Sequence, residues 1–156
     1  MGEHTYALDV TWTGNRGEGT TGYRDYGRTV TLAAVGKPDL LASADPTFRG
    51  DADRWNPEEL LVAALAECHL LSYLHVAVMH GVVVVDYRDS PVGTMSQEGI
   101  GGHFTSVLLR PQVTVATPDM VAVATRIHAE AASACFIASS VNFRVRHQPT
   151  VVARPA

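Results

Sequence analysis

Two cysteines are the residues of this sequence whose chemistry is easiest to foresee. Cys68 lies in the middle of an apolar segment that predicts a helix, and Cys135 lies near the end of a second predicted helix. If the two helices cross, the sulfur atoms could come within disulfide distance, although the spacing alone does not show that they do. Each cysteine also fits a core position, because a free cysteine is commonly buried as a small apolar residue.

The sequence around Cys68 provides little support for a reactive thiol. A working thiol needs its thiolate form, and therefore positive charge nearby. Glu67 is adjacent and its charge opposes thiolate formation, whereas His69 helps only if it is protonated or turned toward the sulfur. The positive group must then come from another segment. Arg24, in the turn formed by residues 22–25, is a candidate, and its alternative interpretation is a solvated turn arginine.

Other motifs are weaker. His128 precedes Cys135 by seven residues, so both share one helical face, which suits a functional face and a core stripe equally well. His69, His75 and His80 do not have the spacing that gathers ligands on a helix, and no CxxC or HExxH motif is present. We therefore expect no metal site. The sequence also lacks a P-loop and a GxGxxG fingerprint, and no bound cofactor is expected. It lacks the GxSxG elbow, so a serine hydrolase of that type is unsupported.

Length and composition favour a single domain over residues 1–156 with a packed core, since 46% of the residues are hydrophobic and 18% are charged. The net charge of −4 argues against sequence-independent nucleic-acid binding. Two cysteines cannot form a disulfide-rich scaffold, and the first residues do not resemble a signal peptide, so we expect a cytoplasmic protein with reduced thiols. Residues 60–85 carry one charge, but a buried helix followed by a strand explains them better than a membrane span.

The elements that must position these residues follow from hydrophobic patterning. We expect strands at 5–12, 28–35 and 40–42, a polar loop at 43–56, and a helix at 57–80 that starts at an Asn-Pro pair. Strands are expected at 82–95 and 101–116, then a helix from 117–119 to 134–138, and a last strand at 141–152. This order predicts an α+β fold.

Several of these segments resemble the OsmC/Ohr family of osmotically inducible and organic hydroperoxide resistance proteins. The Asn-Pro-Glu helix start at 56–58, with Cys68 ten residues after Glu58, is similar to the segment that carries the family's reactive cysteine. Residues 128–141 resemble the stretch around its second cysteine, and residues 12–15 and 22–25 resemble its arginine-bearing turn. The resemblance spans residues 10–147, and the loop at 43–56 looks most like the OsmC-like branch.

The resemblance implies an intertwined α+β homodimer, with two long central helices packed between the sheets of both subunits. It implies thiol-dependent reduction of organic hydroperoxides to alcohols, in which Cys68 becomes a sulfenic acid and Cys135 then forms a disulfide with it. Arg24 would stabilise the thiolate and orient the peroxide. The resemblance also implies that Glu58 holds Arg24. Two helical residues ten apart are separated by about 15 Å, so Glu58 cannot touch Cys68 directly. An external dithiol, a lipoyl group in the best-known branch of the family, would restore the thiols.

Glu67 departs from the family pattern, which usually has a small residue before this cysteine. We expect its carboxylate to face away from the thiol. Because a fold does not fix a function, two other hypotheses stay open. The first is a redox-sensing or small-molecule-binding OsmC-like protein with little turnover. The second is a structural dimer with inert cysteines. Sustained peroxide consumption with a dithiol distinguishes the enzyme from both.

Overall fold

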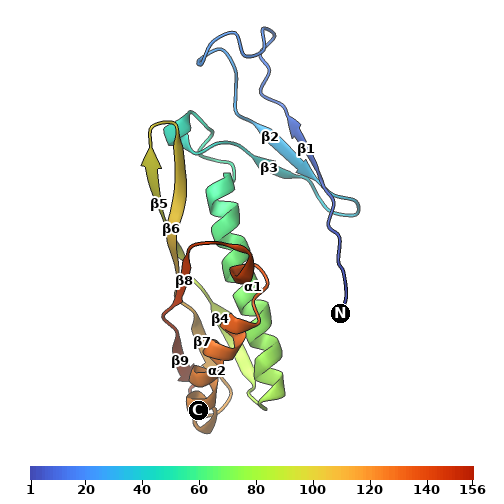
Figure 1. The fold of residues 1–156 in the computed structure, drawn as a ribbon. Helices are drawn as coiled ribbons and strands as arrows, with labels where there is room; N and C mark the ends of the chain where they lie inside the picture. Colours follow the sequence, from blue (N-terminus) through green and yellow to red (C-terminus); the bar gives the residue numbers. More distant parts are fainter. The chain divides into compact units, whose positions relative to one another are not determined.

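The computed structural model describes residues 1–156, which divide into two compact units, Met1–Leu60 and Leu61–Ala156. Figure 1 traces both units along the chain. Each unit is described by itself below. Because helix α1 (Pro57–Met79) runs through the division, the single domain expected over residues 1–156 stays a prediction.

The first unit is built on a three-stranded antiparallel sheet. Its strands are β1 (Asp9–Trp12), β2 (Val30–Ala33) and β3 (Leu40–Ala42), in that order across the sheet. The third strand has the predicted bounds, whereas the first two are shorter than predicted. The reason is a turn after β2, where Lys37 N donates to Ala34 O and Gly36 has a φ of 76°. Residues before Asp9 therefore have no strand opposite them.

The loop between β1 and β2 is closed at its base by two glycines. Gly27 N donates to Gly14 O at 2.7 Å, and Thr13 N donates to Thr29 O at 2.9 Å. A Cβ atom on Gly14 would overlap the Gly27 carbonyl, so the two backbone segments can approach this closely only because both residues lack a side chain. This contact fixes where the turn that carries Arg24 begins and ends.

The polar segment 43–56 is folded rather than extended. It contains the 3₁₀ turn η1 (Pro46–Phe48), which Asp45 caps by accepting a hydrogen bond from Thr47 N at 2.7 Å. The segment ends at the predicted helix start, which the structure confirms. Asn56 Oδ1 accepts from Glu59 N at 2.8 Å, and Glu59 Oε2 accepts from Asn56 N at 3.3 Å. This reciprocal pair is a capping box, and Pro57 occupies the first helical position.

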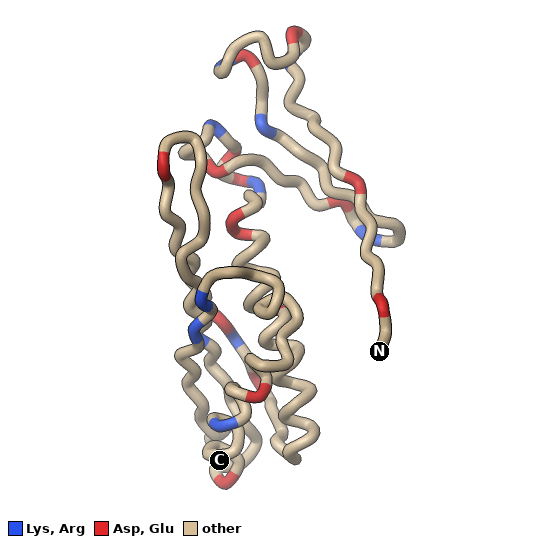
Figure 2. Tube along the Cα trace, viewed as in Figure 1, with Lys and Arg blue, Asp and Glu red and all other residues tan.

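Helix α1 ends one residue before its predicted end, and its last residues from Cys68 onward carry no Lys, Arg, Asp or Glu (Figure 2). By length and composition, residues 57–79 and 118–140 could cross a membrane, a test that core helices also pass. Two polar side chains of α1, His69 and Tyr73, are buried within the second unit. However, 28% of the most apolar stretch of α1 is buried within this chain, so the expectation of a buried helix is met only in part.

The second unit holds two three-stranded sheets. One has β4 (Val84–Arg88), β7 (Gln112–Val115) and β9 (Thr150–Ala153), and the other has β5 (Val92–Glu98), β6 (Gly101–Leu109) and β8 (Arg144–His147), each in that order. The last pair of each sheet is parallel and the other pairs are antiparallel.

The long strands predicted at 82–95, 101–116 and 141–152 are therefore wrong in extent. Each is divided into two strands that belong to different sheets. The breaks fall at residues 89–91, at Pro111 and at residues 148–149, so each contains a proline. Proline has no backbone N–H to donate to a ladder, and here it marks the places where the chain changes sheet.

The second predicted helix is also interrupted. It consists of η2 (Pro118–Met120), α2 (Val121–Ser133) and, after a break at Cys135, η3 (Ala138–Ser140). Thr117 precedes the first turn as predicted, but its side chain makes no capping hydrogen bond. Cys135 therefore lies just beyond the α-helix, and its sulfur accepts a hydrogen bond from Ala138 N at 3.4 Å.

Two buried apolar clusters hold this unit together. One joins the second half of α1 to α2 and β7, and a smaller one joins Leu65 to β6. The buried residues of the larger cluster include Tyr73, Val76, Ala77, Val113, Val115, Ala124 and Ile127. Helices α1 and α2 are thus packed together through the second half of α1.

Candidate functional site

The two cysteines meet in the second unit. Cys68 is half-buried on α1, Cys135 is 1% exposed, and both are free thiols. Burial raises the pKa of Cys135 to about 11, and a hydrogen bond with Cys68 contributes to the rise. Cys135 therefore keeps its proton at neutral pH. The expectation that the two sulfurs come within disulfide distance stays a prediction.

The His69 ring pairs with another histidine and does not supply positive charge to the Cys68 thiol. Its ring lies in the interior, where Nε2 is 3.1 Å from Nδ1 of His128 on α2. Its ring is also 4.3 Å from the His147 ring, centroid to centroid. Burial, together with the neighbouring His147 and His128, lowers the pKa of His69 to about 3. His69 is therefore neutral and supplies no positive charge to Cys68.

Tyr73 packs against the other side of this group of histidines. Its ring stacks on His128 at 4.1 Å between centroids, and its hydroxyl donates to Ala124 O at 2.8 Å. Burial raises the pKa of Tyr73 to about 12 and lowers the pKa of His128 to about 4. The cluster of His69, Tyr73, His128 and His147 is thus a neutral polar core packed between α1, α2 and β8.

The hydrogen bond between the two histidines leaves one ring nitrogen on each without a protein partner. These atoms are Nδ1 of His69 and Nε2 of His128. A neutral imidazole carries one N–H, so one ring donates to the other and the second ring holds its own N–H on the unpartnered side. A protonated ring would add another N–H without an acceptor. The geometry therefore favours the neutral form that the lowered pKa values describe.

A pocket of about 470 Å³ opens beside this cluster. It lies between the end of α2 and β8, and it is lined by His128, Ala129, Ala132, Arg144, Val145, Arg146, His147 and Pro149. The pocket brings solvent close to one face of the histidine cluster. No group of three or more His, Cys, Asp or Glu side chains that could hold a metal ion is present.

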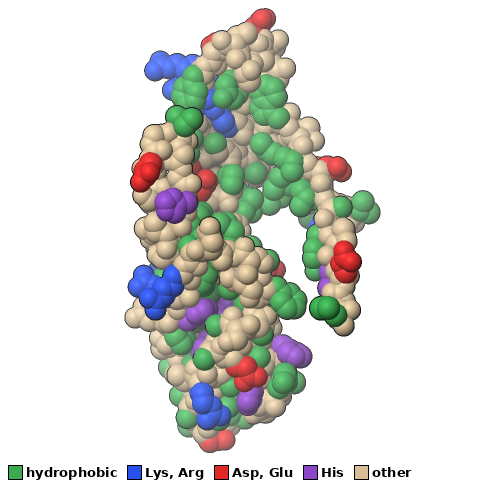
Figure 3. Space-filling model, viewed as in Figure 1, with side chains coloured by type: hydrophobic (Ala, Val, Ile, Leu, Met, Phe, Trp, Pro, Cys, Tyr) green, Lys and Arg blue, Asp and Glu red, His purple; other side chains and the backbone are tan.

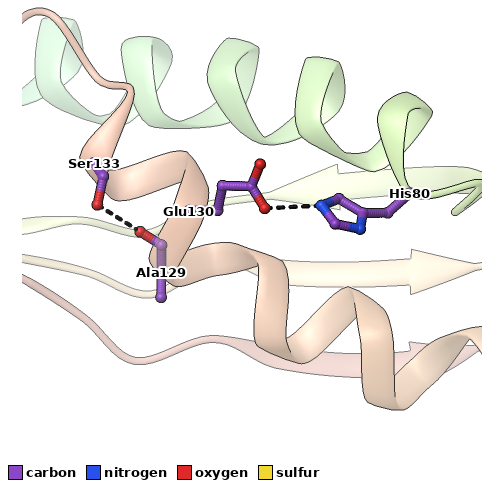
Figure 4. A network of polar contacts seen from close by, with 4 residues as sticks. All are labelled: His80, Ala129, Glu130 and Ser133. Atoms are coloured by element: carbon purple, nitrogen blue, oxygen red, sulfur yellow. Dashed lines mark hydrogen bonds and ion pairs between the residues drawn. The ribbon is translucent and has the colours of Figure 1, made fainter.

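A surface contact ties the end of α1 to α2 near the same region. His80 Nε2 lies 2.8 Å from Glu130 Oε2, and Ser133 Oγ donates to Ala129 O at 3.1 Å (Figure 4). Both members of the His80–Glu130 pair are partly exposed, so the pair contributes little to stability. His80 therefore has a structural contact and is separate from the buried histidines.

Arg24 and Glu58 belong to the first unit, whereas Cys68 belongs to the second. Arg24 is exposed in the turn between β1 and β2, and Glu58 is half-buried on the first turn of α1. The two residues do not form an ion pair with one another in this chain, because the ion pairs are His80–Glu130 and Arg88–Asp86. The assignment of Arg24 and Glu58 to a site with Cys68 stays a prediction.

Glu67 is exposed on α1. Its side chain makes no hydrogen bond and no ion pair, and the expectation that its carboxylate faces away from the Cys68 thiol stays a prediction. Sequence reasoning missed the pairing of His69 with His128. Spacing along one helix could not have revealed this pairing, because it depends on how α1 and α2 pack.

Residues 50–149 match the family model described as OsmC-like protein. The chain belongs to the OsmC-like family. It is similar to an OsmC-like protein of unknown function from Vibrio cholerae, with 33% identity, a TM-score of 0.82, and coverage of 96% of this chain and 100% of that one. The uncharacterized protein YmaD of Bacillus subtilis is 27% identical over 95% of this chain and 93% of the relative.

More distant structures share the OsmC-like fold. An organic hydroperoxide resistance protein from Legionella pneumophila has 19% identity and a TM-score of 0.67, with coverage of 96% of this chain and 98% of that one. These neighbours confirm the α+β architecture that the resemblance implied. The family thus includes proteins named for organic hydroperoxide resistance, while the two more similar relatives have no stated function.

Proposed function

We propose that this OsmC-like protein is a thiol-dependent peroxidase that reduces organic hydroperoxides to alcohols. The observation that carries the proposal is the contact between the half-buried Cys68 and the buried, protonated Cys135. One thiol is half-buried on α1, and the other is buried just beyond the end of α2. This asymmetry suits one cysteine that attacks and one that resolves the product of that attack.

The proposed cycle has three steps. The Cys68 thiolate attacks the terminal peroxide oxygen, the O–O bond breaks, and the alkoxide takes a proton to leave as an alcohol. Cys68 is then a sulfenic acid. The Cys135 thiol attacks that sulfur, which forms the disulfide and releases water. An external dithiol, for example a lipoyl group, then reduces the disulfide by exchange and is itself oxidised to its disulfide.

Arg24 and Glu58 complete the proposed site. The guanidinium of Arg24 would lie beside Cys68, where it would stabilise the thiolate and hold the peroxide by hydrogen bonds. Glu58 would hold Arg24 in that place. The positive charge has to come from such a residue, because neutral His69 provides none.

A homodimer is part of the proposal. Helix α1 exposes a run of apolar side chains to solvent after Cys68, and these are Leu71, Leu74, Val78 and Met79. A second copy that covers this face would remove the apolar surface from water. Light scattering should then give twice the monomer mass. Val78→Glu should lower that mass toward the monomer, and Thr20→Glu, an equal charge change in an exposed loop, should not.

The decisive experiment measures cumene hydroperoxide consumption with dihydrolipoamide for the wild type, Cys68→Ser and Cys135→Ser. We expect turnover that is lost in Cys68→Ser. In Cys135→Ser, we expect one round of oxidation and a sulfenic acid on Cys68 that a dimedone probe traps. Turnover no faster than the uncatalysed reaction, with both thiols still reduced, would contradict the proposal.

The alternative is a redox sensor or small-molecule-binding protein with little turnover. The neutral His69 and the adjacent Glu67 favour it, because neither promotes a thiolate at Cys68. It predicts a Cys68–Cys135 disulfide after peroxide treatment but no sustained consumption with dihydrolipoamide. We also propose that the protein works in the cytoplasm, where dithiols keep cysteines reduced. Cell fractionation followed by immunoblotting tests this.

A further inference from the structure

Four arginines gather around one pocket of the first unit. The pocket has a volume of about 390 Å³ and is lined by Arg16, Arg24, Tyr26, Arg28, Pro46, Arg49 and Gly50. No carboxylate lines it, although the whole chain carries a net charge of −4. Figure 3 shows Lys and Arg side chains gathered in blue on this unit. We call these four arginines and the space between them the arginine pocket.

Arg28 is the fixed member of the arginine pocket. Its two terminal nitrogens donate to Tyr26 O at 2.6 Å and Tyr23 O at 2.7 Å. Its guanidinium also lies over the Tyr26 ring at 3.9 Å and the Tyr23 ring at 4.7 Å from the centroids. Arg28 thus holds the turn that carries Arg24, and it adds a permanent positive charge to the pocket.

The other three arginines keep free donors. Arg16 uses one terminal nitrogen for a hydrogen bond to Arg24 O at 3.3 Å. The guanidinium groups of Arg24 and Arg49 make no hydrogen bond and no ion pair, and that of Arg49 lies 5.8 Å from the Tyr23 ring centroid. Each guanidinium has five N–H donors in a planar fork that matches two oxygens of a carboxylate or phosphate.

The nearby acidic residues are engaged elsewhere. Asp25 accepts a hydrogen bond from the Thr21 hydroxyl, Asp45 caps Thr47 N, and Asp51 accepts from the Ser43 hydroxyl. None of these three residues lines the pocket. No carboxylate lining the pocket therefore neutralises its guanidinium charges, and a negatively charged group from outside this unit is free to bind them.

The backbone at Arg49 gives a separate observation. Its φ of 65° makes it the only residue other than glycine with a positive φ. This conformation is unfavourable for a residue with a Cβ atom, and glycine is the usual occupant. An arginine at this position places a guanidinium on the pocket at a steric cost that glycine would avoid.

We propose that the arginine pocket binds an oxyanion, the carboxylate or phosphate group of a small molecule. Arg16, Arg24 and Arg49 would donate to its oxygens, and Arg28 would hold the turn. This inference goes beyond the proposed peroxidase function. Even if Arg24 also faces Glu58 and the Cys68 thiolate, those two negative charges would balance only two of the four guanidinium charges.

The test is calorimetric titration at low ionic strength with inorganic phosphate and, separately, with acetate, each against a chloride blank of equal ionic strength. We expect saturable binding of at least one probe. Saturation by phosphate alone, by acetate alone or by both assigns the group that the pocket accepts. Arg16→Gln and Arg49→Gly should each weaken the binding by about tenfold or more, because each removes charged hydrogen bonds.

Arg126→Gln and Cys68→Ser are the two control variants. Arg126→Gln changes the same charge at an exposed position on α2 and should bind as the wild type does. Arg49→Gly keeps a residue that tolerates a positive φ, so circular dichroism and the melting temperature should stay unchanged. Cys68→Ser should bind normally, so a failure of the peroxidase proposal would not affect this result. Absence of saturation by both probes, or equal weakening in Arg126→Gln, would overturn the inference.

Discussion

His69 Nε2 and His128 Nδ1 lie 3.1 Å apart in the interior of the second unit, where they join α1 to α2. The Tyr73 and His147 rings pack against this pair, and no carboxylate is among its ring contacts. The surroundings of the pair therefore favour the neutral form of both imidazole rings. A consequence is that the stability of this unit is linked to the protonation of its histidines.

We predict that the free energy of unfolding falls as the pH is lowered below about 6.5. The pKa values of His69 and His128 are lowered to about 3 and about 4 in the folded chain, so the unfolded chain binds protons first. The full stability is present above the unfolded pKa and is lost as the pH falls toward the folded values. At pH 5.5, each of the two residues should cost about 1.4 kcal/mol.

Urea unfolding at pH 7.5 and pH 5.5 checks this prediction. His128→Gln should reduce the difference between the two pH values, because one titrating residue is removed. His4→Gln, a change at an exposed histidine near the N-terminus, should leave the difference as it is in the wild type. An equal free energy of unfolding at both pH values in the wild type would show that these rings are accessible to protons in the folded state.

Tyr73→Phe should lower the free energy of unfolding by about 1–2 kcal/mol. The substitution removes the buried hydroxyl that donates to Ala124 O at 2.8 Å and leaves the ring stacked on His128. Urea titration measures the change, with Tyr6→Phe at an exposed position as the matched control. Equal stability of the wild type and Tyr73→Phe would mean that the Ala124 carbonyl finds another donor in the variant or that the hydrogen bond is weak.

The two cysteines should differ in their reaction with iodoacetamide in the native state. Cys135 is 1% exposed and its pKa is raised to about 11, so less than about one thousandth of it is thiolate at pH 7.5. We expect Cys68 to be alkylated at least about tenfold faster. Peptide mass spectrometry after timed quenching measures both rates. Equal rates would show that the segment after α2 opens readily, and labelling in denaturant gives the reference in which the two should converge.

Much of the fold could be predicted because its signals are local. Asn56 and Pro57 mark the start of α1, and the structure has the capping box there. The division of the long strands was missed, because Pro111 and Pro149 were not given their full weight as ends of β pairing. The pairing of His69 with His128 depends on how α1 and α2 pack, which no spacing along one helix reveals.

The candidate site residues also differ in how far the sequence alone could identify them. Cys68 and Cys135 could be named from the motifs around them, and their contact is visible within one unit. Arg24 could be named from the sequence only as one candidate source of positive charge, and its role beside Cys68 came from the resemblance, because that role depends on the placement of a turn from another unit. The arginine pocket was not foreseen, since Arg16, Arg28 and Arg49 have no common spacing and are gathered by the folding of two separate loops.

Gly14→Ala should damage the turn that carries Arg24. A Cβ atom there would overlap the Gly27 carbonyl, and the hydrogen bond from Gly27 N to Gly14 O at 2.7 Å would be lost or lengthened. We expect the rate of peroxide consumption to fall at least about tenfold, because catalytic groups displaced by about 1 Å lose rate on that scale. Thr20→Ala, in the exposed part of the same loop, is the control and should keep the wild-type rate.

Glu67→Gln should change the rate of Cys68 alkylation by less than about threefold. The Glu67 side chain is exposed and makes no hydrogen bond or ion pair, and the interaction between exposed charges is weakened by water and salt. Iodoacetamide labelling at several pH values and two salt concentrations measures the effect. The control is Glu130→Gln, which removes an equal charge from the surface pair with His80 on α2. An increase of tenfold or more in Glu67→Gln alone would mean that the carboxylate faces the thiol and suppresses its reactivity in the native protein.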